Sequence, residues 1–167
     1  MTLGKLARLR VPLGFAFFAV AFWLASPTST TLAAGGAIAL VGQALRVWAA
    51  GHIEKGREVT RSGPYRLMRH PLYVGSAILG LGFSVAAWSF GTVMLVMTYF
   101  LVTYMAAVRT EEATLDARFA GEYSAYREGR AEGTARRFSA QRAFGSNREY
   151  RSVAGLVGVF ALLWLRV

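Results

Sequence analysis

Long apolar runs constrain the fold of this chain more than any other feature of its sequence. A helix needs about 20 residues to cross the hydrocarbon core of a bilayer, and fewer if its ends snorkel or the bilayer thins. Five runs approach this length, and they span 11–25, 32–50, 72–87, 90–108 and 153–165. Because 54% of the residues are hydrophobic and cluster in this way, the sequence predicts an all-α fold, a polytopic transmembrane helical bundle of about five spans.

Two details of these runs bear on the topology. Only Trp88 and Ser89 separate the third run from the fourth, which predicts a tight helical hairpin or one helix with a break. The first run has the basic start and apolar middle of a signal peptide. No small-x-small cleavage site stands out and further runs follow, so we expect it to be a retained helix.

The distribution of charge fits a membrane better than a nucleic acid, although the formal net charge is +10. Every Lys and Arg except Arg46 and Arg166 lies before the first run or in the connections 51–71 and 109–152, and the other two connections carry no charge. This is the positive-inside pattern. It predicts an integral membrane protein with its N-terminus and basic loops in the cytoplasm and its C-terminus outside, and we expect no nucleic-acid partner.

The sequence has few residues that suit metal or thiol chemistry. It contains no cysteine, which excludes disulfides, thiolate catalysis and thiolate metal ligands. Its two histidines, His52 and His70, are too few for a typical histidine-based metal site. We therefore expect no metal.

The segment 63–75, GPYRLMRHPLYVG, brings charged residues, rings and prolines to the start of the third apolar run. Such residues at the edge of a membrane segment are costly and need a reason. Arg69 and His70 could anchor a helix end at the headgroups with Tyr73 in the aromatic belt, or all three could line a pocket. Pro71 suits a first helical turn, whose free N–H groups could face an acceptor.

An acidic pair, Glu111 and Glu112, follows the fourth run. It is either solvated or part of a pocket, since acids are unfavourable near a helix C-terminus and near anionic headgroups. Glu111 is followed at spacings of three and four by Leu115, Phe119, Tyr123 and Tyr126. This predicts that the helix continues with these residues on one face, while Glu112 and Asp116 lie on a neighbouring face. We expect a break between residues 129 and 133, and an amphipathic surface segment over 127–151.

The polar and small residues inside the apolar runs can each be interpreted in two ways. Arg46 lies in the second run, where we favour snorkelling toward the nearer membrane face over lining a pocket. Gly75, Gly80 and Gly82 favour close helix approach over direct contact with a ligand.

These motifs together resemble the isoprenylcysteine carboxyl methyltransferase and phospholipid methyltransferase group, small integral membrane enzymes that use S-adenosylmethionine. The residues that carry the resemblance are Ser62-Gly63-Pro64-Tyr65, Arg69-His70-Pro71-Leu72-Tyr73-Val74-Gly75, Glu111-Glu112-Ala113-Thr114-Leu115, Phe119, Glu122-Tyr123 and Tyr126. The resemblance implies a single membrane methyltransferase domain over 1–167. Its cofactor-binding core would be 46–127, and a surface segment and last apolar helix would occupy 128–167.

The resemblance also implies the site residues and the reaction. The cytoplasmic pocket for S-adenosylmethionine would be formed by Tyr65, His70, Pro71, Tyr73, Gly75, Glu111 and Glu112. The methyl group would pass to a lipophilic acceptor from the membrane, with a carboxylate favoured and an amine or phenol possible. Arg69 would hold an acceptor carboxylate, with Arg46 next in line, and Glu112 would be the base for an amine or phenol.

Two other functions remain as alternatives. Membrane sterol reductases share an Arg-His-x-x-Tyr-x-Gly core and use NADPH, but they tend to carry Asn at Leu72 and an acid at Ser76. A non-catalytic protein could bind anionic lipid through its basic loops. Members of the methyltransferase group commonly have a proline-containing stretch soon after Tyr126, and residues 127–137 have none. We therefore expect the C-terminal region to shape a different acceptor site.

Overall fold

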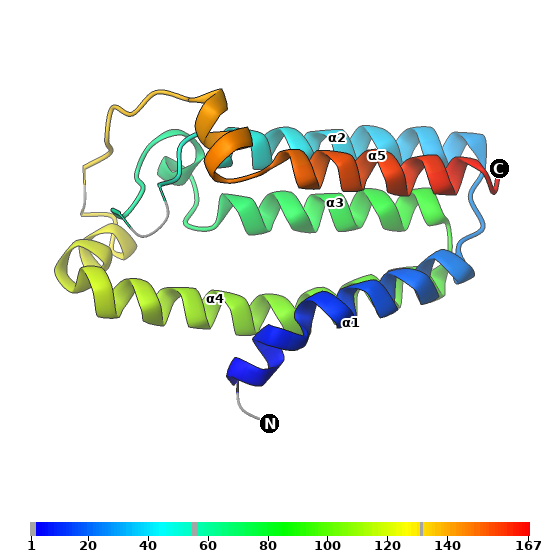
Figure 1. Cartoon of the computed structure of the whole chain (residues 1–167), viewed down its shortest axis with the longest axis horizontal. Coiled ribbons are helices and arrows are strands. Elements are labelled where there is room, and N and C mark those ends of the chain that lie inside the picture. Colours follow the sequence, from blue (N-terminus) through cyan, green and yellow to red (C-terminus); the bar gives the residue numbers. More distant parts are fainter. Residues whose placement is uncertain (1–2, 55–56, 131) are drawn as a thin grey trace.

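The computed structural model describes residues 3–54, 57–130 and 132–167, with side chains from residue 14 on, Ala120 excepted. All regular structure in these residues is helical, which confirms the predicted all-α fold (Figure 1). The helices are α1 (Leu3–Leu24), α2 (Ser29–Ala50), α3 (Pro71–Ala87), α4 (Phe90–Arg127) and α5 (Tyr150–Trp164), with a 3-10 turn η1 (Gly63–Arg66) and a π-helical turn η2 (Gln141–Ser146).

Within the residues whose side chains the structure describes, two helices are long and apolar enough to cross a membrane. They are Ser29–Ala50 and the Phe90–Phe119 part of α4, and they contain the second and fourth predicted runs. The other three runs coincide with shorter apolar stretches of helix among these residues, Gly14–Leu24, Pro71–Ala87 and Tyr150–Trp164. The five predicted segments are therefore helical, while five membrane spans remain a prediction.

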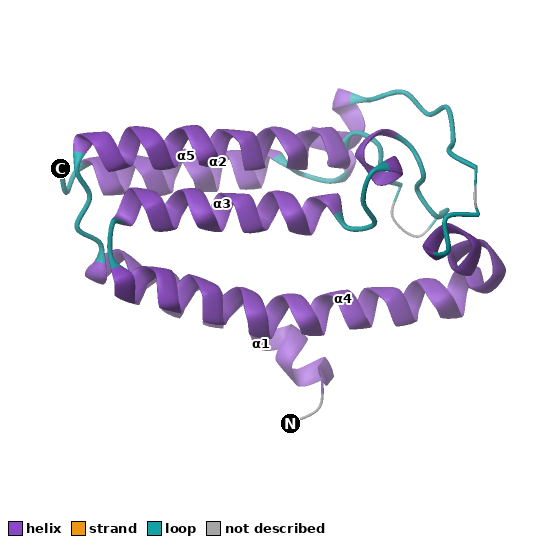
Figure 2. Cartoon of the chain, turned by 180° about the vertical axis from the view of Figure 1, so that it is seen from behind, coloured by secondary structure: helices purple, strands orange, loops and turns teal. Residues whose placement is uncertain are grey.

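The helices form two layers that meet at one end. Helix α2 packs against α3 and α5, and α1 packs against α4 (Figures 1 and 2). The short connections 25–28 and 88–89 lie at one end of the molecule together with the C-terminus. The opposite end, which we call the polar end, contains residues 51–54, 57–70, 109–130 and 132–149.

Glycines bring the backbones of α2 and α3 into direct contact. A Cβ atom added to Gly82 would lie 2.6 Å from the carbonyl oxygen of Gly35, and one added to Gly42 would lie 2.7 Å from that of Gly75. Both distances are too short for a real Cβ atom, and backbone atoms cannot move aside easily. Small residues of this kind let membrane helices pack closely, which supports the favoured reading of Gly75 and Gly82.

A tight hairpin joins α3 to α4, as one of the two sequence readings predicts. Trp88 adopts a left-handed conformation with φ 46° and ends α3, and Ser89 caps α4 by accepting the Thr92 N–H at 3.5 Å. Beyond this turn the two helices diverge, because α3 follows α2 while α4 follows α1 (Figure 2).

Helix α4 continues past its apolar part, as predicted, but it is not one regular helix. Phe119 has non-helical angles, φ −132° and ψ 39°. Residues 111–126 therefore do not share one continuous helical face, which corrects the prediction from their spacing. A straight helix would separate Glu112 from Tyr123 by about 16 Å, yet the charge of Glu112 acts on the Tyr123 hydroxyl.

The segment after α4 also differs from the expected amphipathic surface segment. The helix ends at Arg127 and Gly129 has φ 72°, which agrees with the predicted break. The chain then crosses the loop 51–62, where the Ser139 N–H donates to the Gly51 carbonyl at 3.1 Å and the Thr134 N–H to the Arg61 carbonyl at 3.3 Å. These contacts hold the segment against the protein.

The close contact of α2 and α3 generates a stability prediction. We expect Gly82→Ala to lower the free energy of unfolding by about 1–3 kcal/mol, because the new methyl group meets backbone atoms of α2. Gly158→Ala on α5 is the matched control, since a Cβ atom there has no neighbour within 4 Å. Thermal unfolding of both variants in one detergent measures the difference. Equal unfolding temperatures would contradict the backbone contact.

Candidate functional site

Two segments that are 42 residues apart in the sequence meet at the polar end through His70 and Glu112. His70 precedes α3, and Pro71 restricts its backbone and begins the helix. The Nε2 atom of His70 lies 3.2 Å from Oε1 of Glu112, and NH1 of Arg69 lies 3.4 Å from the same oxygen. The motif before α3 and the acidic pair of α4 thus form one cluster.

The surroundings of Glu112 favour its ionised form. This residue lies four positions beyond Val108, where the fourth apolar run of the sequence ends, in the helical stretch that continues to Phe119. The hydrogen bond with His70 lowers the pKa of Glu112, and the charges of His70 and Arg69 act in the same direction, while partial burial opposes them. Glu112 is consequently a charged hydrogen-bond acceptor at neutral pH and a weak base.

Tyrosine rings surround this cluster on both sides. The Tyr73 ring lies 5.9 Å from the His70 ring and meets Tyr104 edge-on at 5.3 Å. The Tyr126 hydroxyl donates to the Tyr65 carbonyl at 2.6 Å, which ties the end of α4 to η1. Aromatic groups from α3, α4 and η1 therefore border the same region.

The polar end contains several buried polar atoms that lack a hydrogen-bond partner within the described residues. They are Tyr65 OH, Thr60 Oγ1, Thr134 Oγ1, Arg61 Nε and Glu58 Oε1, while the Tyr123 hydroxyl interacts with the Glu112 carboxylate. Leaving such a group buried and unpaired costs about 1–3 kcal/mol, so water or a bound polar molecule is needed to complete their hydrogen bonds.

The hydroxyls of Tyr65 and Tyr123 remain neutral donors over the physiological range. Burial raises the pKa of Tyr65, and the charge of Glu111 adds to this effect. Burial likewise raises the pKa of Tyr123 to about 12, with the charge of Glu112 as the next cause.

The sequence analysis favoured snorkelling of the Arg46 side chain toward the membrane surface. In the structure this side chain instead binds residues of α3 and the residue before α5. Its Nε lies 2.6 Å from Oε1 of Glu149, which is 4% exposed, and its NH1 donates to the Leu72 carbonyl at 3.4 Å and to the Ser76 hydroxyl. Gln43 joins the network by donating to Glu149 at 3.4 Å. Arg46 thereby connects α2 to the first turn of α3 and to the start of α5.

The loop that precedes η1 is held from two sides. The Nδ1 atom of His52 lies 3.0 Å from the Ser62 hydroxyl, and a Cβ atom on Gly63, whose φ is 56°, would lie 2.5 Å from the His52 ring. From the C-terminal segment, Arg142 donates to the Gly51 carbonyl at 2.9 Å and Asn147 to that of Ala50 at 2.8 Å. These contacts fix the path of the chain that leads to Tyr65 and His70.

His52 belongs to this support and not to a charged site. Burial lowers the pKa of His52, and the charges of Arg142, Arg136 and Arg66 lower it further, so the ring is neutral at physiological pH. In the part of the chain that the structure describes, no group of three or more His, Asp or Glu residues could hold a metal ion.

The structure thus brings together most of the residues expected at the site. Arg69, Pro71 and Tyr73 contact the His70–Glu112 cluster or adjoin it in the chain. Glu111 precedes Glu112 in α4, and Tyr65 is joined to the end of α4 through the hydroxyl of Tyr126. Gly75 is apart from this group, because it faces Gly42 and Arg46 within the helix packing. Sequence reasoning missed Glu149, since nothing in the local pattern around it signals a partner 103 residues away.

Comparison with known proteins defines the class to which this arrangement belongs. Residues 9–122 match the family model described as phospholipid methyltransferase. The match covers well over half of the chain, and the chain belongs to this family of methyltransferases that act on membrane lipids. The resemblance read from residues 62–126 is therefore confirmed, and the family favours a methyltransferase over a sterol-type reductase.

Two curated proteins are also similar. The chain is 36% identical over 97 residues to the cobalt-zinc-cadmium resistance protein CzcN of Cupriavidus metallidurans, across 56% of this chain and 44% of that protein. It is 30% identical over 99 residues to the nickel-cobalt-cadmium resistance protein NccN of Alcaligenes xylosoxydans xylosoxydans, across 58% of this chain and 45% of that protein. The matches thus span less than half the length of these relatives. No solved structure matches the chain significantly.

The Arg46–Glu149 pair generates a prediction that is independent of activity. Glu149→Gln removes the charge that balances a guanidinium whose side chain is only 21% exposed. We expect a loss of about 1–3 kcal/mol in the free energy of unfolding. Glu128→Gln, whose side chain is 48% exposed, is the control and should change it by less than about 0.5 kcal/mol. Thermal unfolding in detergent is the measurement, and equal effects of the two variants would contradict the proposed connection.

Proposed function

We propose that the polar end binds S-adenosylmethionine and that the protein transfers a methyl group from it to a lipophilic acceptor in the membrane. The observation that carries this proposal is the meeting of the His70–Glu112 cluster with buried, unpaired polar atoms at one end of an apolar bundle. A water-soluble cofactor and a lipid acceptor can meet only at such a boundary between polar and apolar surroundings.

The residues at the polar end fit the cofactor. S-adenosylmethionine, when bound, supplies an electrophilic methyl group on a sulfonium, and it also carries an ammonium, a carboxylate, a ribose diol and an adenine. Glu111 and Glu112 can accept hydrogen bonds from the ammonium or the diol, and the neutral hydroxyls of Tyr65 and Tyr123 can donate to the carboxylate or to adenine. The Tyr73 ring can face the positive sulfonium. These groups include the Tyr65 hydroxyl, which has no hydrogen-bond partner within the described residues.

Arg69 is better suited than Arg46 to hold the acceptor. The guanidinium of Arg46 is committed to Glu149, Leu72 and Ser76. The side chain of Arg69 is 46% exposed and has one 3.4 Å contact with Glu112, a weak interaction for an exposed pair. Its planar fork can therefore turn to a carboxylate and grip both oxygens.

The chemistry of the cluster favours an acceptor that needs no base. S-adenosylmethionine would supply the electrophilic methyl group, and an ionised carboxylate held by Arg69 would already carry the lone pair that accepts it, with no proton to remove. Catalysis then depends on position and on the exclusion of water. The lowered pKa of Glu112 makes this residue a poor base. An amine or phenol acceptor, which must lose a proton, would therefore react less readily here than a carboxylate.

The orientation in the membrane follows from the same arrangement. We infer that the polar end faces the cytoplasm and that the C-terminus is outside. In support, the uncharged connections 25–28 and 88–89 and the C-terminus gather at one end, while the charged connections gather at the other.

Cofactor affinity tests this function directly. Glu112→Ala should weaken binding of S-adenosylmethionine about 10- to 150-fold, since a hydrogen bond to a charged group contributes about 1.5–3 kcal/mol. Glu111→Ala should weaken it in the same range if that carboxylate also contacts the cofactor. Calorimetry on purified protein in detergent is the measurement.

Glu128→Ala is the control for this experiment, because Glu128 is exposed and pairs locally with Arg130. It should bind the cofactor as the unaltered protein does. Unchanged affinity in both Glu111→Ala and Glu112→Ala would remove the acidic pair from the pocket.

The role of Arg69 has its own test. Arg69→Lys keeps the charge but loses the planar fork, so turnover with a carboxylate acceptor should fall at least tenfold while cofactor affinity changes little. Turnover and affinity should be measured in one preparation. A parallel loss of both would assign Arg69 to the cofactor, and no change in either would leave it as a headgroup anchor.

A further inference from the structure

We propose that residues 132–137 form a strap that opens and closes over the segment 58–66, that Arg136 is its latch, and that its opening admits a polar molecule to the candidate site. The inference rests on the proposed function only for the identity of that molecule, S-adenosylmethionine. Both overall views show this part of the chain at the outer edge of the polar end (Figures 1 and 2). The strap lies outside residues 9–122, the part that matches the family model.

The strap lies directly on the chain that leads to the site. The Thr134 N–H donates to the Arg61 carbonyl at 3.3 Å, and the Thr134 carbonyl accepts from Arg66 at 2.8 Å. A Cβ atom on Gly133 would lie 2.9 Å from Nε of Arg66, so the strap touches this side chain closely. Arg66 ends η1, the turn that the hydroxyl of Tyr126 ties to α4. The strap and α4 therefore both hold the segment that precedes the site.

Buried polar atoms without a partner gather at this contact. Within the described residues, Oγ1 of Thr134 in the strap and three atoms of the segment beneath it lack a hydrogen bond, namely Glu58 Oε1, Thr60 Oγ1 and Arg61 Nε. Because these atoms are buried, water cannot reach them while the strap keeps this position. Lifting the strap would give them hydrogen-bond partners, which favours opening. The structure thus shows a closed strap whose contacts are in part unfavourable.

Arg136 supplies the charged contacts that oppose opening. Its NH2 lies 2.8 Å from Oε2 of Glu58, its NH1 lies 3.6 Å from Oε1 of Glu54, and NH1 also donates to the His52 carbonyl at 3.4 Å. Otherwise the strap is weakly held, since residues 132–137 have no regular secondary structure and none of them is fully buried. Partly exposed ion pairs contribute modestly to stability, so this latch can be released.

The two ends of the strap suit a hinged motion. Gly129 precedes it with φ 72°, and a Cβ atom there would have no neighbour within 4 Å. At the other end the chain is anchored, because a Cβ atom on Gly51 would lie 2.2 Å from the ring of Phe138 and the Ser139 N–H donates to the Gly51 carbonyl at 3.1 Å. The strap can therefore lift from the segment 58–66 while its C-terminal end stays in place.

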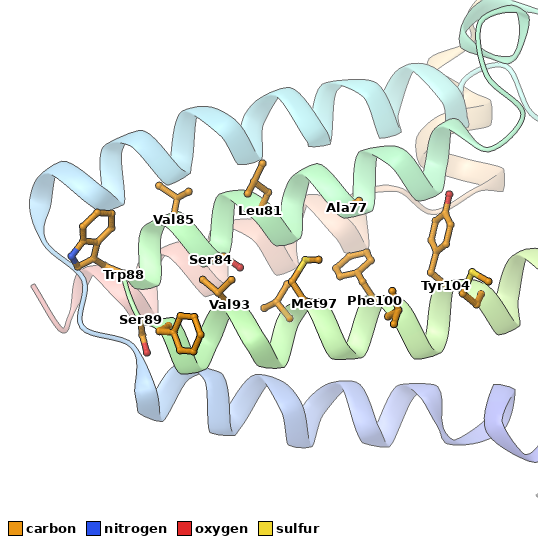
Figure 3. A pocket seen from close by; sticks show the side chains of 14 residues that line it. Ala77, Leu81, Ser84, Val85, Trp88, Ser89, Val93, Met97, Phe100 and Tyr104 are labelled. Atoms are coloured by element: carbon orange, nitrogen blue, oxygen red, sulfur yellow. The ribbon is translucent and has the colours of Figure 1, made fainter.

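A charged cofactor needs an entry at the polar end. The bundle also has an apolar groove along α3 and α4, with Leu81, Val93 and Phe100 in its lining (Figure 3). A charged molecule would lose its hydration there for little hydrogen bonding in return, so this groove is a poor route for it. Opening of the strap instead exposes polar groups of the segment that leads to His70.

Amide hydrogen exchange tests the strap without any cofactor. The Arg61 carbonyl protects the Thr134 N–H only while the strap is closed. Arg136→Gln should therefore raise the exchange rate of this amide about five- to tenfold. Arg137→Gln is the matched control, because the neighbouring Arg137 is exposed, and it should leave the rate unchanged. The buried Ala39 in α2 should exchange equally in all three proteins, which shows that the bundle is intact. Equal Thr134 rates in the two variants would overturn the inference.

A reversible cross-link tests whether the strap controls entry. The chain has no cysteine, so Glu58→Cys and Arg136→Cys in one protein can be joined by a short bifunctional methanethiosulfonate reagent and released by a reductant. The linked protein should bind S-adenosylmethionine about tenfold more slowly than the released one, because the strap cannot lift. Arg136→Cys alone, treated with the same reagent, should show no effect of the reductant.

The outcomes separate this inference from the proposed function. Equal binding rates in the linked and released protein would contradict control of entry by the strap and leave cofactor binding intact. A protein that binds no S-adenosylmethionine in either form, while its Thr134 amide responds to Arg136→Gln, would contradict the proposed function and not the opening of the strap.

Discussion

The backbone contact between α2 and α3 determines where everything else in the bundle lies. Gly35 and Gly42 face Gly82 and Gly75, so the two helices touch along almost their whole length. This contact brings Arg46 to the first turn of α3 and sets His70 at the polar end. Helix α4 follows α3 through the hairpin and then diverges toward α1, while Phe100, Tyr104 and Glu112 keep it in contact with α3 and with His70.

The charged residues at the polar end form two groups, one that supports the helix packing and one that belongs to the candidate site. The Arg46–Glu149 pair is largely buried and internally satisfied, and it links α2, α3 and α5. The Glu112 carboxylate of the His70–Glu112 cluster is more exposed, and the same end of the molecule contains buried hydroxyls, such as that of Tyr65, with no partner in the described residues. Supporting residues whose own hydrogen bonds are satisfied hold their neighbours in fixed positions. Such support suits a site whose remaining polar groups must position a reacting molecule.

Apolar runs and the local motif allowed much of this arrangement to be predicted. The runs gave the correct positions of the helices, and Trp88-Ser89 marked the hairpin. The combination of the motif before α3 with the acidic pair predicted that residues 42 apart belong together.

Other features depend on contacts that no local pattern encodes. The kink at Phe119 breaks a regular spacing that the sequence maintains, and it needs neither proline nor glycine at that position. Glu149, the partner of Arg46, is 103 residues away in the sequence. The periodicity of a single helix cannot predict a contact between residues so far apart. The crossing of residues 132–139 over the loop 51–62 uses backbone groups, which carry no sequence signal at all.

Transfer of a labelled methyl group to lipid tests the central claim most directly. Membranes that contain the protein would be incubated with methyl-labelled S-adenosylmethionine, alongside membranes without it and membranes with His70→Gln. The account predicts label in the organic extract only with the unaltered protein. Label that is absent from the lipid fraction, or equal in all three membranes, would contradict it.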